Sequence, residues 1–138
     1  MLKELQAFTP SFTQAWTLLG IAIALEVMGT TCMKLSQGFT RPVPSVAMFA
    51  FYALAFSCNT MAIKTLDLSV TYAVWSGVGT VATACIGIFY FKEAATALKL
   101  ASISMIVIGV FGLHAASRNQ LVDKTQQTQP VEPATLAK

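Results

Sequence analysis

Long apolar runs separated by short polar links dominate the chain. Residues 44–63 and 70–91 contain no charged side chain, and residues 100–117 contain only His114. Residues 16–33 form a similar run that holds one charge, Glu26. Each run has about the 20 residues that an α-helix needs to cross a hydrocarbon layer of ~30 Å. The pattern therefore predicts four membrane-spanning segments.

The apolar runs are continuous and do not alternate as barrel strands would, so helices are the expected spanning elements. We predict an all-α integral membrane fold with four transmembrane helices in residues 15–118, at about 15–35, 44–63, 69–91 and 98–117. Asp67 is the expected N-cap of the third helix. Residues 1–14 form an N-terminal extension. Residues 119–138 are rich in Gln, Thr and Pro, which predicts a disordered tail.

Composition supports the membrane class, because 55% of the 138 residues are hydrophobic and only 11% are charged. About a quarter of the residues are charged in soluble domains. The net charge of +3 comes from dispersed basic residues, so we expect no nucleic-acid partner. Cys32, Cys58 and Cys85 lie in predicted spans without ligand-like spacing, which predicts neither a disulfide nor a metal site. We expect a protein that is not an enzyme and uses no cofactor.

Positive residues near the spans are balanced between the two sides of the predicted topology. One side carries Lys3, Lys64, Arg118 and Lys124, and the other carries Lys34, Arg41, Lys92 and Lys99. Positive residues near the spans normally set the orientation of a membrane protein. Two interpretations follow: another signal fixes one orientation, or copies insert both ways and opposite copies pair.

Glu26 is the feature that most needs a function. An acidic group at the centre of a membrane helix costs about 2.5–3.5 kcal/mol on insertion scales. The apolar runs 44–63, 70–91 and 100–117 contain no Lys or Arg to pair with it, and Lys34 lies two turns away on the same helix. Glu26 is therefore expected to be protonated, or to face a hydrated cavity and meet a cation. A carboxyl group that holds either a proton or a cation is the minimal requirement for exchanging one for the other.

The helix face around Glu26 carries mostly small side chains. At helical spacing its neighbours are Ala22, Ile23, Gly29, Thr30 and Met33. The small members of this set leave room beside the carboxylate, or they allow close packing of helices. Both interpretations stay open.

The third predicted helix supplies aromatic surface. Tyr72, Trp75, Ser76 and Gly79 share one face by their spacing. Aromatic faces attract organic cations, and a hydroxyl can orient a carboxylate. Tyr72 and Trp75, like Tyr52 in the second helix, could instead belong to an interfacial aromatic belt.

Glycines and other small residues mark two further features. Gly77 and Gly79 permit a bend of the third helix or close contact with a neighbouring helix. In the fourth helix Ser102, Gly109 and Ala116 recur every seven residues, with Gly112 close by. This stripe suits a contact between two copies of the chain.

Three segments together resemble the small multidrug resistance family of bacterial exporters: ALEVMGTTCMKLSQGFTRPVPSV, TYAVWSGVGT and IVIGVFGLHAASR. The resemblance runs from about Trp16 to Arg118. It implies an antiparallel homodimer of four-helix subunits in the bacterial inner membrane. Such a dimer would exchange protons for lipophilic or quaternary ammonium cations.

The resemblance also implies roles for individual residues. Glu26 matches the carboxylate shared by proton and substrate, and Tyr72 and Trp75 match aromatic residues that line the substrate pocket. Gly77 and Gly79 match the flexible third helix. Further matching positions near the pocket are Ala22, Ile23, Gly29, Thr30, Tyr52 and Ser76. The fourth-helix dimer contact would involve Ser102, Gly109 and Gly112, although the family usually has Gly where this chain has Ser102.

Two other functions remain as alternatives. The first is a guanidinium or polyamine exporter of the same family; its guanidinium branch carries a tryptophan three residues after the glutamate, where this chain has Gly29. The second is a membrane scaffold subunit without transport activity, in which Glu26 could be replaced by Gln at no cost.

Overall fold

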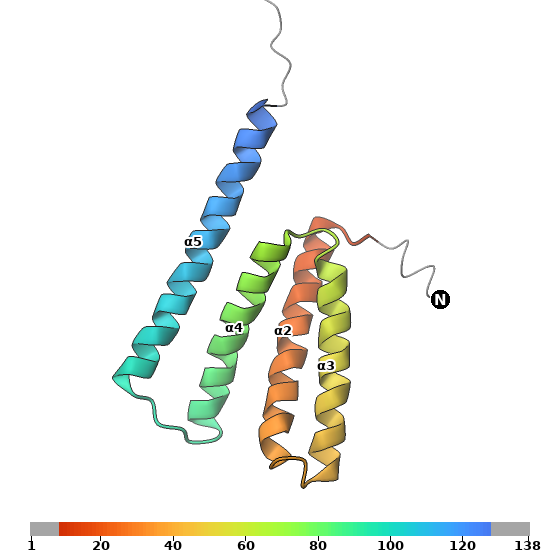
Figure 1. Cartoon of the computed structure of the whole chain (residues 1–138), viewed down its shortest axis with the longest axis vertical. Coiled ribbons are helices and arrows are strands. Elements are labelled where there is room, and N and C mark those ends of the chain that lie inside the picture. The colour runs from red at the N-terminus through yellow and green to blue at the C-terminus, as the bar shows by residue number, and fades with distance from the viewer. Residues whose placement is uncertain (1–8, 128–138) are drawn as a thin grey trace, which may run out of the picture.

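The computed structural model of the protein describes residues 9–127 and is helical over most of them. Its helices are α2 (Phe12–Leu35), α3 (Pro42–Ala62), α4 (Leu68–Phe89) and α5 (Ala97–Gln127). Helices α2, α3 and α4 lie side by side, whereas α5 lies on the outer side of α4 and extends beyond the other three (Figure 1). The all-α class and the four helices predicted from the apolar runs are confirmed for this part of the chain.

The first two helices begin at residues suited to helix starts. The Ser11 backbone N–H donates to the Gln14 side chain at 2.8 Å, and the Gln14 N–H donates to Ser11 Oγ at 3.4 Å. This reciprocal capping box starts α2 at Phe12, earlier than the expected residue 15. Proline occupies the first position of α3, where a missing N–H costs nothing. Between the two helices the chain reverses through left-handed backbone, including Gly38 with φ of +69°.

The ends of α4 and α5 differ from the sequence-based boundaries. Asp67 is the N-cap of α4 as predicted, but its side chain makes no capping hydrogen bond. Helix α4 ends at Phe89, shortly before Lys92, whose φ of 57° is incompatible with a continuing helix. Helix α5 continues to Gln127, so residues 119–127 are helical although the sequence placed them in the tail. No Gly or Pro occurs between Gly112 and Pro130 to stop it. The tail prediction for residues 128–138 lies outside the described residues.

Three helices, α2, α3 and α4, are long and apolar enough to cross a membrane, and α5 is apolar over Ala97–Leu113. Large apolar side chains on their outer surfaces are exposed, among them Val46, Phe49, Phe89 and Phe111. A soluble monomer rarely exposes so much contiguous apolar surface. Lipid tails can cover these faces without cost, because the helices satisfy their own backbone hydrogen bonds.

A small core lies where α2 meets its neighbours. Leu19, Ile23 and Val27 of α2 are buried together with Ala62 and Leu66. Helix α2 contacts both α3 and α4, and α4 in turn contacts α5. Because α2 lies between two helices, one of its faces packs against α3 and another packs against α4. This placement decides which residues around Glu26 reach open space.

Candidate functional site

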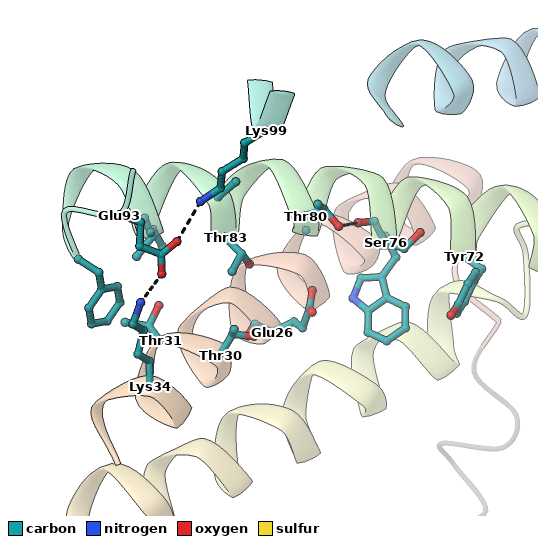
Figure 2. Close-up of a pocket in the computed structure, with 16 residues that line it drawn as sticks. Glu26, Thr30, Thr31, Lys34, Tyr72, Ser76, Thr80, Thr83, Glu93 and Lys99 are labelled. Atoms are coloured by element: carbon teal, nitrogen blue, oxygen red, sulfur yellow. Dashed lines mark hydrogen bonds and ion pairs between the residues drawn. The ribbon is translucent and has the colours of Figure 1, made fainter. Parts of the chain in front are cut away.

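A cavity of about 570 Å³ lies between α2, α4 and the beginning of α5, and Figure 2 shows its polar lining. Helix α2 contributes Glu26, which is half-buried. The other lining residues of α2 are Thr30, Thr31 and Lys34, and those of α4 are Tyr72, Trp75, Ser76, Gly79, Thr80, Thr83, Ala84, Ile86 and Gly87. Phe91, Glu93 and Lys99 complete the wall. The cavity therefore brings the lone intramembrane carboxylate together with the aromatic face of α4.

The Glu26 carboxylate reaches across to α4 at Gly79. A Cβ atom on residue 79 would lie 2.7 Å from Glu26 Oε2, closer than unbonded carbon and oxygen normally approach. The missing side chain of Gly79 is therefore what leaves space for the carboxylate. No basic side chain in the described part of the chain forms an ion pair with Glu26.

Aromatic rings line the cavity on the side of Glu26 towards the beginning of α4. The rings of Tyr72 and Trp75 meet edge to face, with centroids 6.0 Å apart. Phe56 of α3 contacts Trp75 in the same manner at 5.6 Å. Trp75 Nε1 is buried and finds no hydrogen-bond acceptor among residues 9–127. Trp75 lines the cavity, and its indole N–H has no acceptor in the described part of the chain.

Thr30 and Tyr52 form a polar contact next to the carboxylate. Thr30 Oγ1 donates to the Glu26 carbonyl oxygen at 3.0 Å and lies 3.1 Å from Tyr52 Oη. Tyr52 itself does not line the cavity. It stands behind Thr30 and links α3 to the wall of the site.

Besides Tyr52, three further residues predicted near the pocket do not line the cavity of this single copy. Ala22 and Ile23 are buried in the packing of α2, and neither lines the cavity. A Cβ atom on Gly29 would lie 3.4 Å from Phe51 Cβ and 3.5 Å from the Tyr52 ring. At Gly29 the position matches the close-packing interpretation, since α3 lies against that side of α2.

The two glycines of α4 face opposite sides of the helix. Gly79 faces Glu26 on α2, whereas a Cβ atom on Gly77 would overlap Val110 of α5. Both positions thus allow a close approach between helices. Flexibility at Gly77 and Gly79 stays a prediction.

The residues expected at a dimer contact are open in a single copy. Ser102, Gly109 and Gly112 are exposed on α5, and no atom lies within 4 Å of a Cβ built on either glycine. This surface is available to a partner, and its role as a dimer contact stays a prediction.

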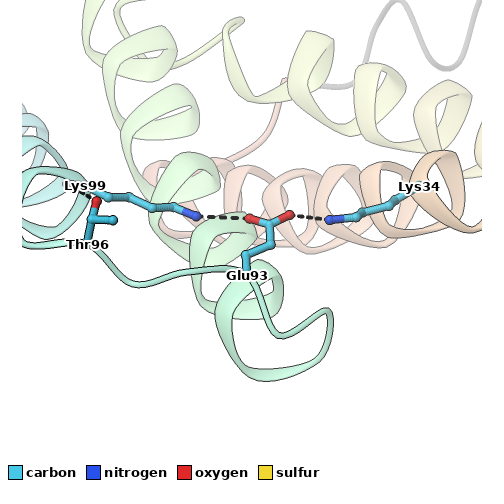
Figure 3. A network of polar contacts seen from close by, with 4 residues as sticks. All are labelled: Lys34, Glu93, Thr96 and Lys99. Carbon is cyan, nitrogen blue, oxygen red and sulfur yellow. Dashed lines mark hydrogen bonds and ion pairs between the residues drawn. The ribbon is translucent and has the colours of Figure 1, made fainter.

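An ion-pair network at one end of the cavity was missed by the sequence analysis (Figure 3). Lys34 of α2 and Lys99 of α5 both donate to Glu93, the latter at 3.0 Å. These hydrogen bonds, first from Lys34 and then from Lys99, and the two positive charges hold the pKa of Glu93 below its usual value. Lys34 Nζ also lies 4.4 Å from the centre of the Phe91 ring. Lys34 therefore belongs to this network and is not the partner of Glu26.

Two threonines of α4 were also missed. Thr80 and Thr83 line the cavity, and their positions continue the helical spacing of Tyr72, Ser76 and Gly79. Extending that face by one further turn would have found them. No comparable signal links Glu93 to Lys34, because 59 positions separate them along the chain.

The chain is similar to a known protein family and to several named relatives. The family model described as Small Multidrug Resistance protein matches residues 14–106. The multidrug resistance protein EbrB of Bacillus licheniformis is 39% identical over 110 residues, which cover 80% of this chain and 92% of EbrB.

Two further relatives carry more specific names. The quaternary ammonium compound-resistance protein QacG of a Staphylococcus species is 40% identical over 90 residues, covering 65% of this chain and 84% of QacG. The guanidinium exporter of Proteus vulgaris is 37% identical over 103 residues, covering 75% of this chain and 99% of the exporter.

Proposed function

Because the chain belongs to the Small Multidrug Resistance family, we propose that it exports lipophilic and quaternary ammonium cations across the bacterial plasma membrane in exchange for protons. Glu26 is the group that proton and substrate share. The working form is an antiparallel homodimer.

The observation that carries this proposal is the meeting of Glu26, Tyr72 and Trp75 at one cavity. A carboxylate there offers a charge to a cation, and the two rings offer aromatic faces. Cation–π contacts contribute about 0.5–2 kcal/mol each, the larger values at sites shielded from water. A quaternary ammonium ion has no N–H to donate, so charge and ring faces are the interactions it can use.

Exchange follows from the occupancy of one carboxyl group. With a proton on Glu26 the site is neutral and attracts cations weakly. When a cation enters, its positive charge stabilises the ionised carboxylate over the protonated carboxyl group, and the proton leaves. No lysine or arginine competes for Glu26 in the described part of the chain, so the site stays free for either ligand.

A homodimer is supported by what a single copy leaves open. One copy supplies one such carboxylate, and the small residues Gly109 and Gly112 of α5 are uncovered. Two copies would supply two carboxylates and could cover each other through these surfaces. The balanced charges of the links are compatible with opposite insertion of the two copies.

Gly29 disfavours the guanidinium branch of the family. A Cβ atom at this position already reaches 3.4 Å from α3, so the tryptophan typical of that branch would need a different packing of α2 against α3. The two remaining alternatives, polyamine export and a scaffold role without transport, are distinguished from the proposal by the following transport experiment.

The experiment is a transport assay in vesicles that contain the purified protein and an imposed pH gradient. With the wild-type protein, we expect tetraethylammonium to move in the direction opposite to the protons that flow down their gradient. With Glu26→Gln, we expect no such movement. Guanidinium and spermidine, tested in the same vesicles, should be moved more slowly. Equal transport by wild type and Glu26→Gln would overturn the assignment of Glu26. If no cation moves in response to the pH gradient, the transport proposal is rejected and the scaffold role is favoured.

A further inference from the structure

The cavity extends along α4 on both sides of Glu26, well beyond the aromatic residues Tyr72 and Trp75. Along α4 its lining runs from Tyr72 to Gly87, which at 1.5 Å per residue is about 22 Å. Glu26 meets α4 at Gly79, near the middle of this length. Aromatic rings line the half towards Tyr72, whereas polar and charged side chains line the half towards Glu93.

Threonines line the second half. Thr31 faces it from α2, and Thr80 and Thr83 face it from α4 (Figure 2). Threonine hydroxyls in helices commonly donate to the carbonyl four residues earlier, and Thr31 and Thr80 do so at 2.8 and 2.7 Å. Thr83 makes no such bond, and its hydroxyl has no hydrogen-bond partner within residues 9–127. Its hydroxyl is therefore free to bind a ligand in the cavity.

The far end of this half is positively charged. Glu93 is packed against Gly87, about 12 Å along α4 from the point where Glu26 meets Gly79. Lys34 and Lys99 pair with this single carboxylate, so the network carries a net charge of +1 (Figure 3). Each ammonium group has three N–H donors, and only one is given to Glu93. The end of the cavity therefore repels a second cation and favours groups that accept hydrogen bonds.

We propose that the part of the cavity between Glu26 and Glu93 is a second, polar subsite, which binds a hydrogen-bonding tail attached to a cationic substrate. The cationic head lies at Glu26 against the aromatic rings. A hydroxyl, ether or amide group on its tail meets the Thr83 hydroxyl and the lysine N–H groups. The preferred substrates are then cations with a polar tail, and purely alkyl or aryl cations use only the aromatic half.

This inference rests on the proposed function, because it places the cationic head at Glu26. It can be tested with two probes of equal chain length, hexyltrimethylammonium and (6-hydroxyhexyl)trimethylammonium. Their heads are identical, and six carbons are enough to carry the hydroxyl from Glu26 to Thr83, which is about 6 Å from Gly79 along the helix. Binding of both is measured by calorimetry on the full-length protein in detergent.

We expect the wild-type protein to bind the hydroxylated probe about three- to tenfold more tightly, the range for one net hydrogen bond. Thr83→Val keeps the shape of the side chain and removes the hydroxyl, so the two probes should then bind almost equally. Thr83→Ser should retain the preference. Thr60→Val is the matched control, because Thr60 is exposed on α3, outside the cavity lining.

A third probe examines the charge of the subsite. (6-Aminohexyl)trimethylammonium carries a second positive charge and should bind more weakly than the hydroxylated probe. Tighter binding of this dication, or a hydroxyl preference that survives in Thr83→Val, would overturn the polar subsite. Loss of hexyltrimethylammonium binding in Glu26→Gln tests the proposed function separately, since that probe does not use the subsite.

Discussion

The Glu26 carboxylate lies directly against the backbone of Gly79, so closely that a Cβ atom on residue 79 would be 2.7 Å from Oε2. The space for the carboxylate on α2 is therefore provided by a missing side chain on α4. Each half of this contact depends on the other, and a change of either residue alters the same site.

Gly79→Ala should displace the carboxylate and weaken binding of tetraethylammonium by tenfold or more, which corresponds to at least about 1.4 kcal/mol. The helix itself should not suffer, because alanine is the better helix former by about 1 kcal/mol. Gly20→Ala is the control, since nothing lies within 4 Å of a Cβ at that position. Binding by Gly79→Ala at the level of Gly20→Ala would show that the contact does not constrain the site.

Trp75 is predicted to contact the cation through its ring. Trp75→Phe keeps an aromatic face and should retain part of the affinity, whereas Trp75→Ala should lose about tenfold or more, given that a desolvated cation–π contact contributes up to about 2 kcal/mol. Tyr72→Phe separates the role of the hydroxyl from that of the ring. Unchanged tetraethylammonium binding by Trp75→Ala would assign the residue to an interfacial aromatic belt.

Proton release on cation binding should depend on Glu26 alone. In weakly buffered detergent solution, tetraethylammonium should release protons from the wild-type protein at pH values where Glu26 is protonated before the cation arrives. The release should shrink as the pH rises, and the affinity should increase with pH and then level off. Glu26→Gln should release none, and Glu26→Asp should retain exchange with a shifted pH dependence. Equal, pH-independent binding by wild type and Glu26→Gln would exclude this carboxylate as the coupling site.

The Glu93 network predicts a stability effect that depends on pH. Lys34 and Lys99 lower the pKa of Glu93 in the folded protein, so the folded state binds this proton more weakly than the unfolded chain does. The stabilisation is therefore present above the ordinary glutamate value of about 4.3 and is lost as the pH falls through the lowered pKa.

Glu93→Gln should accordingly unfold at a lower temperature than wild type near pH 7 and at nearly the same temperature in strong acid. Added salt should narrow the difference at pH 7, because the network is partly exposed. Asp67→Asn serves as the comparison, since Asp67 has no ion-pair partner in the described residues. A difference for Glu93→Gln that is the same at every pH would count against the network.

The orientation of the chain in the membrane is a further prediction. If the four-against-four balance of positive residues means insertion in both directions, a reporter at the C-terminus should be found on both sides of the membrane. Two additional lysines in the link between α4 and α5 should bias the population strongly to one side. A wild-type reporter found on one side only would rule out dual insertion.

The apolar runs of the sequence were enough to predict the helices and the exceptional position of Glu26. A span in lipid must satisfy its backbone internally, so its length and lack of charge are visible in the sequence itself. Helical spacing likewise placed Tyr72, Trp75 and Ser76 on one face, and the structure brings all three to the cavity.

Only the packing of the helices decided which neighbours of Glu26 reach the cavity. Helical spacing groups Ala22, Gly29 and Thr30 around Glu26, but it does not say that Ala22 is buried, that α3 covers Gly29 and that Thr30 stays at the cavity. The Lys34–Glu93 pair joins residues 59 positions apart, and no local pattern connects them. Periodicity depends on one helix at a time, whereas the site depends on which other helix lies against each face.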